Sequence, residues 1–132
     1  MQRPLTLTVI AALALAASAL AGPQVAGALL DGKTFEIRLV EQDKSEPQRD
    51  SLIFAEGTFD STGCRQYGFA RTPYTVERKG EAWHFAAEAK SEKEGTNRWK
   101  GIVSGNHIAG TLVWSKPGQA TINYTFTGEI KE

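Results

Sequence analysis

Cysteine is nearly absent from this chain, which has 132 residues and a single thiol at Cys64. An intramolecular disulfide is therefore excluded, although an oxidising compartment would permit one. The thiol also lies far from the N-terminus, which excludes a lipid-modified cysteine at the start of a processed chain. The fold must rest on hydrophobic packing and backbone hydrogen bonds, and the chain is expected to be a monomer or a Cys64-linked dimer.

An excess of charge of either sign is also lacking, because 15 Lys and Arg stand against 15 Asp and Glu. Nucleic-acid binding needs a basic surface that neutralises phosphates, and this balance provides none. A polybasic cluster for anionic membranes is missing as well. We therefore expect neither nucleic acid nor a membrane surface as a partner.

The N-terminus carries a long uncharged apolar run. It follows a short start that contains Arg3, and it ends in the small-x-small pattern Ala19-Leu20-Ala21. This order is typical of a secretory signal peptide, here residues 1–21. Cleavage after Ala21, or alternatively after Ala19, predicts a periplasmic or secreted domain over residues 22–132, with no membrane span. The alternative is an uncleaved anchor, which needs about 20 strongly apolar residues, more than this alanine-rich run supplies.

Helical spacing of apolar residues is missing after Gly32, where alternation with a period of two begins. Phe35, Ile37 and Leu39 alternate with polar residues, as expected for an antiparallel strand with one dry and one wet face. Seven further runs of this kind contain Leu52, Phe59, Tyr74, Phe85, Trp99, Leu112 and Tyr124. The pattern predicts an all-β domain of about eight strands.

The connections between these runs differ in length. Tight two-residue turns are predicted at Glu56-Gly57, Lys79-Gly80 and Gly105-Asn106, and a type II turn at Pro117-Gly118. Long polar connections are predicted at residues 42–50, 63–72 and 90–96. In a meander, the tight turns then share one pole and the long connections share the other with the Pro-Gly turn. Because eight twisted strands tend to close, we expect a single antiparallel up-and-down barrel with a closed floor and a loop-rich mouth. A two-sheet sandwich is the alternative.

The inward-facing residues leave the state of the interior open. Aromatic side chains, including Trp83 and Trp99, favour a filled interior and are better explained as core than as a carbohydrate-binding platform. Ala87, Gly101 and Gly110 favour either free space or sharp bends in the strands. Eight strands enclose a volume that side chains just fill or that holds one small ligand.

This pattern resembles the calycin group, and most nearly a minimal lipocalin. The shared features are the signal peptide, the eight meandering strands over residues 30–130, and the opening Gly32-Lys33-Thr34-Phe35, where lipocalins have Gly-x-Trp. The resemblance implies binding of small apolar molecules. Similar small barrels also act as secreted inhibitors, so the fold alone does not choose a function. No further lipocalin motif matches, and no family ligand residue is carried over.

The third connection, at the predicted mouth, has the most unusual composition. It contains Cys64, Arg65, Tyr67 and Phe69, and Trp114 ends its strand beside the same mouth. We predict these five residues as the ligand-binding set. Arg65 would favour a thiolate at Cys64 if both were exposed. A ligand clamp, an intermolecular disulfide and a redox-sensitive thiol are then alternatives to a buried cysteine beneath a lid of Tyr67 and Phe69.

Catalytic and metal-binding residues are not recognisable. A nucleophilic cysteine needs a base nearby, and neither His84 nor His107 is expected close to Cys64. Structural zinc usually needs four ligands, often in close pairs, and these three residues are widely spaced. We therefore predict a protein without catalytic residues, metal or cofactor.

These observations predict an exported, non-enzymatic barrel that binds a small apolar or amphipathic molecule at its mouth. The alternative is a periplasmic or secreted protein-interaction or enzyme-inhibitor module with a packed interior. A thiol-dependent enzyme is a third hypothesis, and it predicts rapid alkylation of Cys64 at neutral pH.

Overall fold

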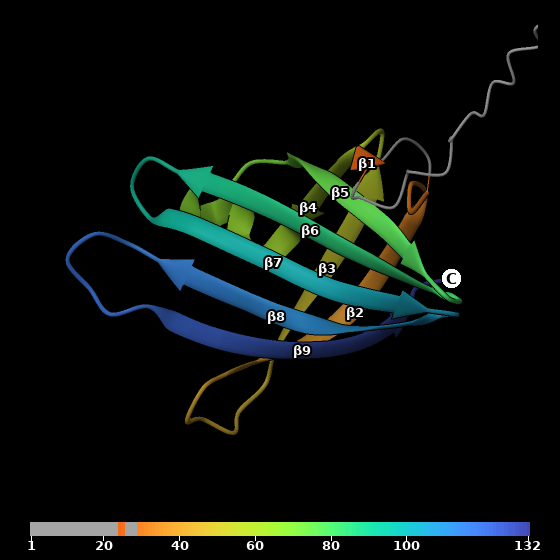
Figure 1. Ribbon diagram of the computed structural model, residues 1–132. Coiled ribbons are helices and arrows are strands. Elements are labelled where there is room, and N and C mark those ends of the chain that lie inside the picture. Colours follow the sequence, from red (N-terminus) through yellow and green to blue (C-terminus); the bar gives the residue numbers. More distant parts are fainter. Residues whose placement is uncertain (1–23, 26–28) are drawn as a thin grey trace, which may run out of the picture.

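The structure is a computed structural model that describes residues 24–25 and 29–132 (Figure 1). The signal peptide predicted for residues 1–21 lies outside these residues. No helix in the described ranges is long and apolar enough to cross a membrane.

Nearly all regular structure in the described ranges is β-strand. The elements are β1 (Gln24–Val25), β2 (Lys33–Glu41), β3 (Gln48–Ala55), β4 (Thr58–Ser61), the 3-10 helix η2 (Thr62–Tyr67), β5 (Thr72–Lys79), β6 (Ala82–Ser91), β7 (Gly95–Ser104), β8 (His107–Ser115) and β9 (Ile122–Ile130). Each strand from β2 to β9 pairs antiparallel with the next, and β9 returns to pair with β2. This confirms the up-and-down barrel of eight strands and contradicts the sandwich. Strand β1 pairs with β5 beside this ring.

Three tight turns lie at one pole, the floor. The β3–β4 turn is Glu56-Gly57, with positive φ at both residues (52° and 74°), as a type I′ hairpin requires. The β7–β8 turn is Gly105-Asn106. The β5–β6 turn is Gly80-Glu81, one residue later than predicted, because Gly80 takes the first turn position with a φ of 65°. The turns at β5–β6 and β7–β8 lie beside the C-terminus in Figure 1.

The opposite pole, the mouth, carries the longer connections, but two of them are shorter than predicted. The β2–β3 connection comprises residues 42–47 rather than 42–50, because β3 begins at Gln48. Ser91 pairs with Gly95, so the β6–β7 connection comprises only residues 92–94 rather than a long loop over 90–96. Lys90 is exposed between the inward residues Ala89 and Ser91 and therefore belongs to β6, while residues 92–94 form the turn. The predicted type II turn is present, with Gly118 at a φ of 84° and a hydrogen bond from Gln119 N to Lys116 O of 3.2 Å.

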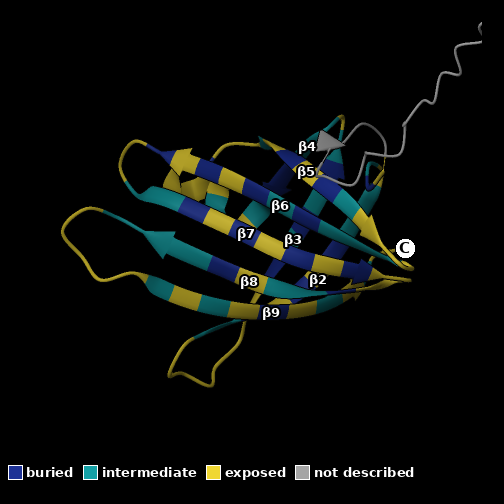
Figure 2. Cartoon of the chain, viewed as in Figure 1, coloured by how far each residue is buried: buried dark blue, intermediate teal, exposed yellow. Residues whose placement is uncertain are grey.

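The floor half of the barrel is filled by aromatic rings. Phe54 lies at their centre, with ring centroids 4.9 to 6.1 Å from those of Phe35, Phe59, Tyr74 and Phe85. All five are at most 3% exposed. Figure 2 shows the resulting alternation of buried and exposed bands along β6 and β7. The inward face predicted from the period of two is therefore the core.

The inward glycines do not create free space. Gly101 and Gly110 are register partners across β7 and β8, flanked by Phe85 on β6 and Phe126 on β9. A Cβ atom would lie 2.5 Å from the Phe85 ring at Gly101 and 2.8 Å from the Phe126 ring at Gly110. The Phe85 and Phe126 rings therefore pack directly on the two glycines, which is possible because glycine has no side chain.

A polar contact closes the floor. Tyr74 Oη accepts a hydrogen bond from Leu30 N at 3.1 Å and donates one to Asp31 Oδ1 at 2.8 Å. The same carboxylate accepts the N–H of Gly57 in the β3–β4 turn. These bonds attach the segment before β2 to β5 and to the β3–β4 turn, and Leu30 is fully buried as part of the core.

Candidate functional site

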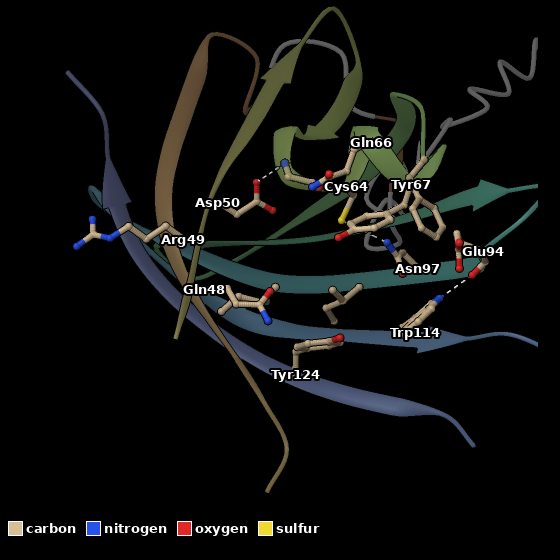
Figure 3. A pocket seen from close by; sticks show the side chains of 14 residues that line it. Gln48, Arg49, Asp50, Cys64, Gln66, Tyr67, Glu94, Asn97, Trp114 and Tyr124 are labelled. Atoms are coloured by element: carbon tan, nitrogen blue, oxygen red, sulfur yellow. Dashed lines mark hydrogen bonds between the residues drawn. The ribbon is translucent and has the colours of Figure 1, made fainter. Parts of the chain in front are cut away.

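A cavity of about 400 Å³ occupies the mouth half of the barrel (Figure 3). Its lining comes from the mouth ends of β2, β3, β7, β8 and β9, from η2 and the segment after it, and from the β6–β7 turn. The volume falls in the range of about 300–1,000 Å³ that is usual for small-molecule sites. The interior is therefore filled toward the floor and hollow toward the mouth.

Four of the five predicted ligand-binding residues line this cavity. Cys64, Tyr67 and Phe69 approach it from η2 and the following turn, and Trp114 approaches it from the end of β8. Phe69 is 6% exposed, whereas Tyr67 at the rim is 53% exposed. The lid predicted from these two aromatic residues therefore covers only part of the mouth.

Arg65, the fifth predicted residue, does not line the cavity. Its guanidinium group binds the buried carboxylate of Asp60, with Nε 3.0 Å from Oδ2. Cys64 and Arg65 are consecutive residues of the 3-10 helix η2, so their side chains point in different directions. The expectation that Arg65 would favour a thiolate is not supported by this geometry.

The thiol of Cys64 lies in a setting that disfavours ionisation. Burial raises its pKa above the usual value, and the carboxylates of Asp50 and Asp60 raise it further, while the neighbouring polar groups of Ser61 and Asn97 act in the opposite direction. The Asn97 contact joins Nδ2 to Sγ at 3.5 Å. A nucleophilic cysteine has the opposite character, a lowered pKa in an electropositive setting.

We predict that Cys64 is alkylated slowly at pH 7.5. Iodoacetamide should react roughly tenfold more slowly with the folded chain than with the urea-unfolded chain, because the thiolate is scarce and access is restricted. The pH at which the alkylation rate rises should also be higher for the folded chain than for the unfolded chain, because the pKa of Cys64 is raised in the folded chain. Mass spectrometry measures the labelling, with Cys64→Ser as the unlabelled control. Faster labelling of the folded chain would contradict this prediction and favour the thiol-enzyme hypothesis.

Asp50 and Asn97 are buried polar residues in the cavity lining that were not predicted from the sequence. Asp50 lies two residues before Leu52 on the inward face of β3, and Asn97 lies two residues before Trp99 on the inward face of β7. They are 9% and 3% exposed. Extending each apolar alternation by one step would have found both, as polar residues in phase with a buried face.

Asp50 holds the start of η2 against β3. Its carboxylate accepts hydrogen bonds from Gly63 N at 2.8 Å, from Thr62 Oγ1 at 3.2 Å and from the hydroxyl of Ser61. It also accepts the N–H of its neighbour Ser51 at 2.7 Å. Four donors satisfy the oxygens of one carboxylate, so the negative charge of Asp50 stays at the cavity while its lone pairs are occupied.

The rim opposite η2 is held by a second set of contacts. Trp114 Nε1 donates to Glu94 O at 2.6 Å, and Lys116 Nζ lies 2.9 Å from Glu94 Oε1. Ser91 Oγ, on the same hairpin, donates to Tyr67 O at 2.8 Å. The β6–β7 hairpin thus joins η2 to the end of β8, and the cavity has a defined shape.

The two histidines lie away from the cavity. His84 is on the outer face of β6, and His107 lies at the floor, where Nδ1 is 2.7 Å from Glu129 Oε2. Among the described residues no group of three or more His, Cys, Asp or Glu side chains is placed to hold a metal ion.

Comparisons with protein-family models, with curated proteins and with solved structures found no match for this chain. The class of protein is therefore defined by its architecture, a closed antiparallel barrel of eight strands similar to that of the calycins. The Gly32-Lys33-Thr34-Phe35 segment spans the end of a turn and the start of β2, as in the predicted opening strand.

Proposed function

We propose that this chain is an exported, non-enzymatic binding protein whose mouth cavity holds one small amphipathic molecule. The observation that carries the proposal is the cavity itself, which lies above a filled aromatic floor and opens between the mouth connections. Export to the periplasm or outside the cell belongs to the same proposal and rests on the sequence pattern of residues 1–21.

Both apolar and polar groups line the cavity. Leu39, Leu112, Phe69 and Trp114 provide an apolar surface, and Leu112 is only 3% exposed at its base. Gln48, Asn97 and Tyr124 add polar groups to the same lining. Small-molecule sites commonly combine a mainly apolar lining with a few polar groups that orient the ligand. This combination favours an amphipathic ligand over a purely apolar one.

The test is binding of N-phenyl-1-naphthylamine, an uncharged apolar dye, to the chain that begins at Gly22. We expect a saturable rise in dye fluorescence. Leu112→Trp should weaken dye binding at least about tenfold, since it fills the cavity base, at a stability cost of about 1–3 kcal/mol for overpacking.

Thr111→Trp is the matched control, because Thr111 is the exposed neighbour on the outer face of β8. It should leave dye binding unchanged. Thermal unfolding of both variants checks that the barrel persists. No saturable binding by the unaltered chain would remove the proposal.

The alternative, a protein-interaction or inhibitor module, retains one supporting observation. Tyr67 is exposed at the rim and can contact a partner, but Phe69 is buried and contributes no surface patch. The variant that tests this alternative is therefore Tyr67→Ala rather than Phe69→Ala. Loss of a partner from the exported fraction on this change, without loss of dye binding, would favour the alternative.

A further inference from the structure

We propose that the cavity selects amphipathic cations, meaning molecules with an apolar body and a primary ammonium group that donates a hydrogen bond to Asn97. This inference rests on the function proposed above and specifies the ligand class for the same cavity. Four features carry it: an open acceptor on Asn97, the negative charge of Asp50, the outward direction of Arg49, and the aromatic lining.

The side-chain amide of Asn97 is deeply buried and poorly satisfied. The residue is 3% exposed, and Figure 3 shows its side chain directed from β7 toward Cys64 within the cavity. Within the described ranges, the hydrogen bond of its side chain is the 3.5 Å contact from Nδ2 to Cys64 Sγ, a weak acceptor. A buried amide oxygen without a donor is costly, and a ligand that brings a donor would remove this cost.

The charge at the cavity is negative. Asp50 places an unpaired carboxylate in the lining, since its four partners are N–H and O–H donors rather than cations. Glu94, the other carboxylate in the lining, is paired with Lys116 and adds little net charge. Arg49 also borders the cavity, but Figure 3 shows its guanidinium group directed away from it.

Burial is the main cause of the raised pKa of two titratable groups in the lining, and nearby carboxylates add to it. Burial raises the pKa of Tyr124, and the carboxylate of Glu41 raises it further. The pKa of Cys64 is raised by burial and then also by Asp50 and Asp60. Burial opposes a bound charge of either sign, whereas the carboxylate contributions oppose a bound carboxylate and favour a bound cation.

The aromatic lining suits both parts of such a ligand. Tyr67, Phe69, Trp114 and Tyr124 border the same cavity. Aromatic surfaces bury an alkyl chain, and their faces attract ammonium groups within about 6 Å of the ring centre. A fatty acid would gain only the burial of its alkyl chain, because the faces of aromatic rings do not attract a carboxylate.

The experiment compares decylammonium, decanol and decanoate as competitors for the bound dye, at pH 7 and below their micelle concentrations. The three share an alkyl chain and differ in the polar end. We expect decylammonium to compete best and decanoate worst. The two should differ at least about tenfold, the ratio that corresponds to about 1.4 kcal/mol. Raising the salt concentration should weaken decylammonium binding and leave decanol unchanged.

Two variants assign the selectivity to named groups. Asn97→Leu keeps the side-chain size and removes the acceptor, so the preference for decylammonium over decanol should fall severalfold while dye binding persists. Glu94→Gln leaves the Lys116 charge unpaired at the rim, so it should weaken decylammonium and strengthen decanoate. Glu92→Gln, an exposed residue of the same hairpin outside the lining, is the matched control with the same change of charge.

The outcomes separate the two proposals. Dye binding with decanoate competing as well as decylammonium would overturn the cation selectivity and leave the proposed function standing. No dye binding and no competition would overturn both. Unchanged selectivity in both Asn97→Leu and Glu94→Gln would also overturn the selectivity proposed here.

Discussion

Replacing Phe54 by alanine is expected to destabilise the barrel by about 3–5 kcal/mol, the usual range for removing a buried phenylalanine. Phe54 is fully buried and its ring meets four other aromatic rings contributed by β2, β4, β5 and β6. The surrounding rings belong to a closed barrel and cannot all move inward, so most of the space left by the ring would remain as a cavity. A domain of this size has a total stability of about 5–15 kcal/mol, of which this loss is a large part.

Urea unfolding followed by tryptophan fluorescence measures this loss. The midpoint should fall by roughly 2 M at a slope of about 2 kcal/mol per molar urea. Ile102→Ala is the control, because Ile102 is an apolar residue of the same barrel that is 43% exposed on the outer face. Its free energy of unfolding should stay within about 0.5 kcal/mol of that of the unaltered chain. Equal losses in the two variants would contradict the core described here.

Replacing Asp50 by alanine is expected to cost about 3 kcal/mol and to abolish ligand binding at the same time. Hydrogen bonds to a charged group contribute about 1.5–3 kcal/mol each, and they do not add fully when they share one acceptor. The change leaves Gly63 N and two hydroxyl groups of the segment 61–63 without their acceptor. Because this segment begins η2, Cys64 and Tyr67 would lose their position at the cavity.

Three measurements follow the Asp50→Ala change: urea unfolding, dye binding and alkylation of Cys64. Dye binding should be lost and alkylation should accelerate, since the thiol gains access and loses a nearby carboxylate. Glu46→Ala removes the same charge from an exposed position in the β2–β3 connection and should change none of the three. An Asp50→Ala chain that binds dye normally would show that η2 does not depend on this carboxylate.

Strands and hairpins were predictable because their signals are local. The alternation around Phe35 and Leu112, and glycine at the turn positions 57 and 105, indicate element type within a few residues. The β6–β7 connection was predicted too long, because charged side chains on the outer face of a strand resemble those of a loop. The β5–β6 turn was misplaced by one residue, because Lys79 and Glu81 fit either side of Gly80.

The pole of the barrel that carries the cavity was predictable from the sequence, but the polar groups in the cavity lining were not. The composition around Cys64 indicated the third connection, and four of the five residues named there or on β8 line the cavity. Arg65 was wrongly paired with Cys64, since adjacency in sequence does not show that two side chains share a side. Asp50 and Asn97 were not predicted, because the sequence does not show whether an inward polar residue lines a cavity or makes a local hydrogen bond.

The all-β class, the order of the strands and the pole that carries the tight turns were predictable from the sequence, since all three follow from the period of two and the turn chemistry along the chain. That the floor is filled and the mouth hollow is known only from the three-dimensional structure. That outcome depends on the register between strands distant in sequence, above all the pairing of β9 with β2. This closure brings Leu39 of β2 and Tyr124 of β9 together in the lining of the open space.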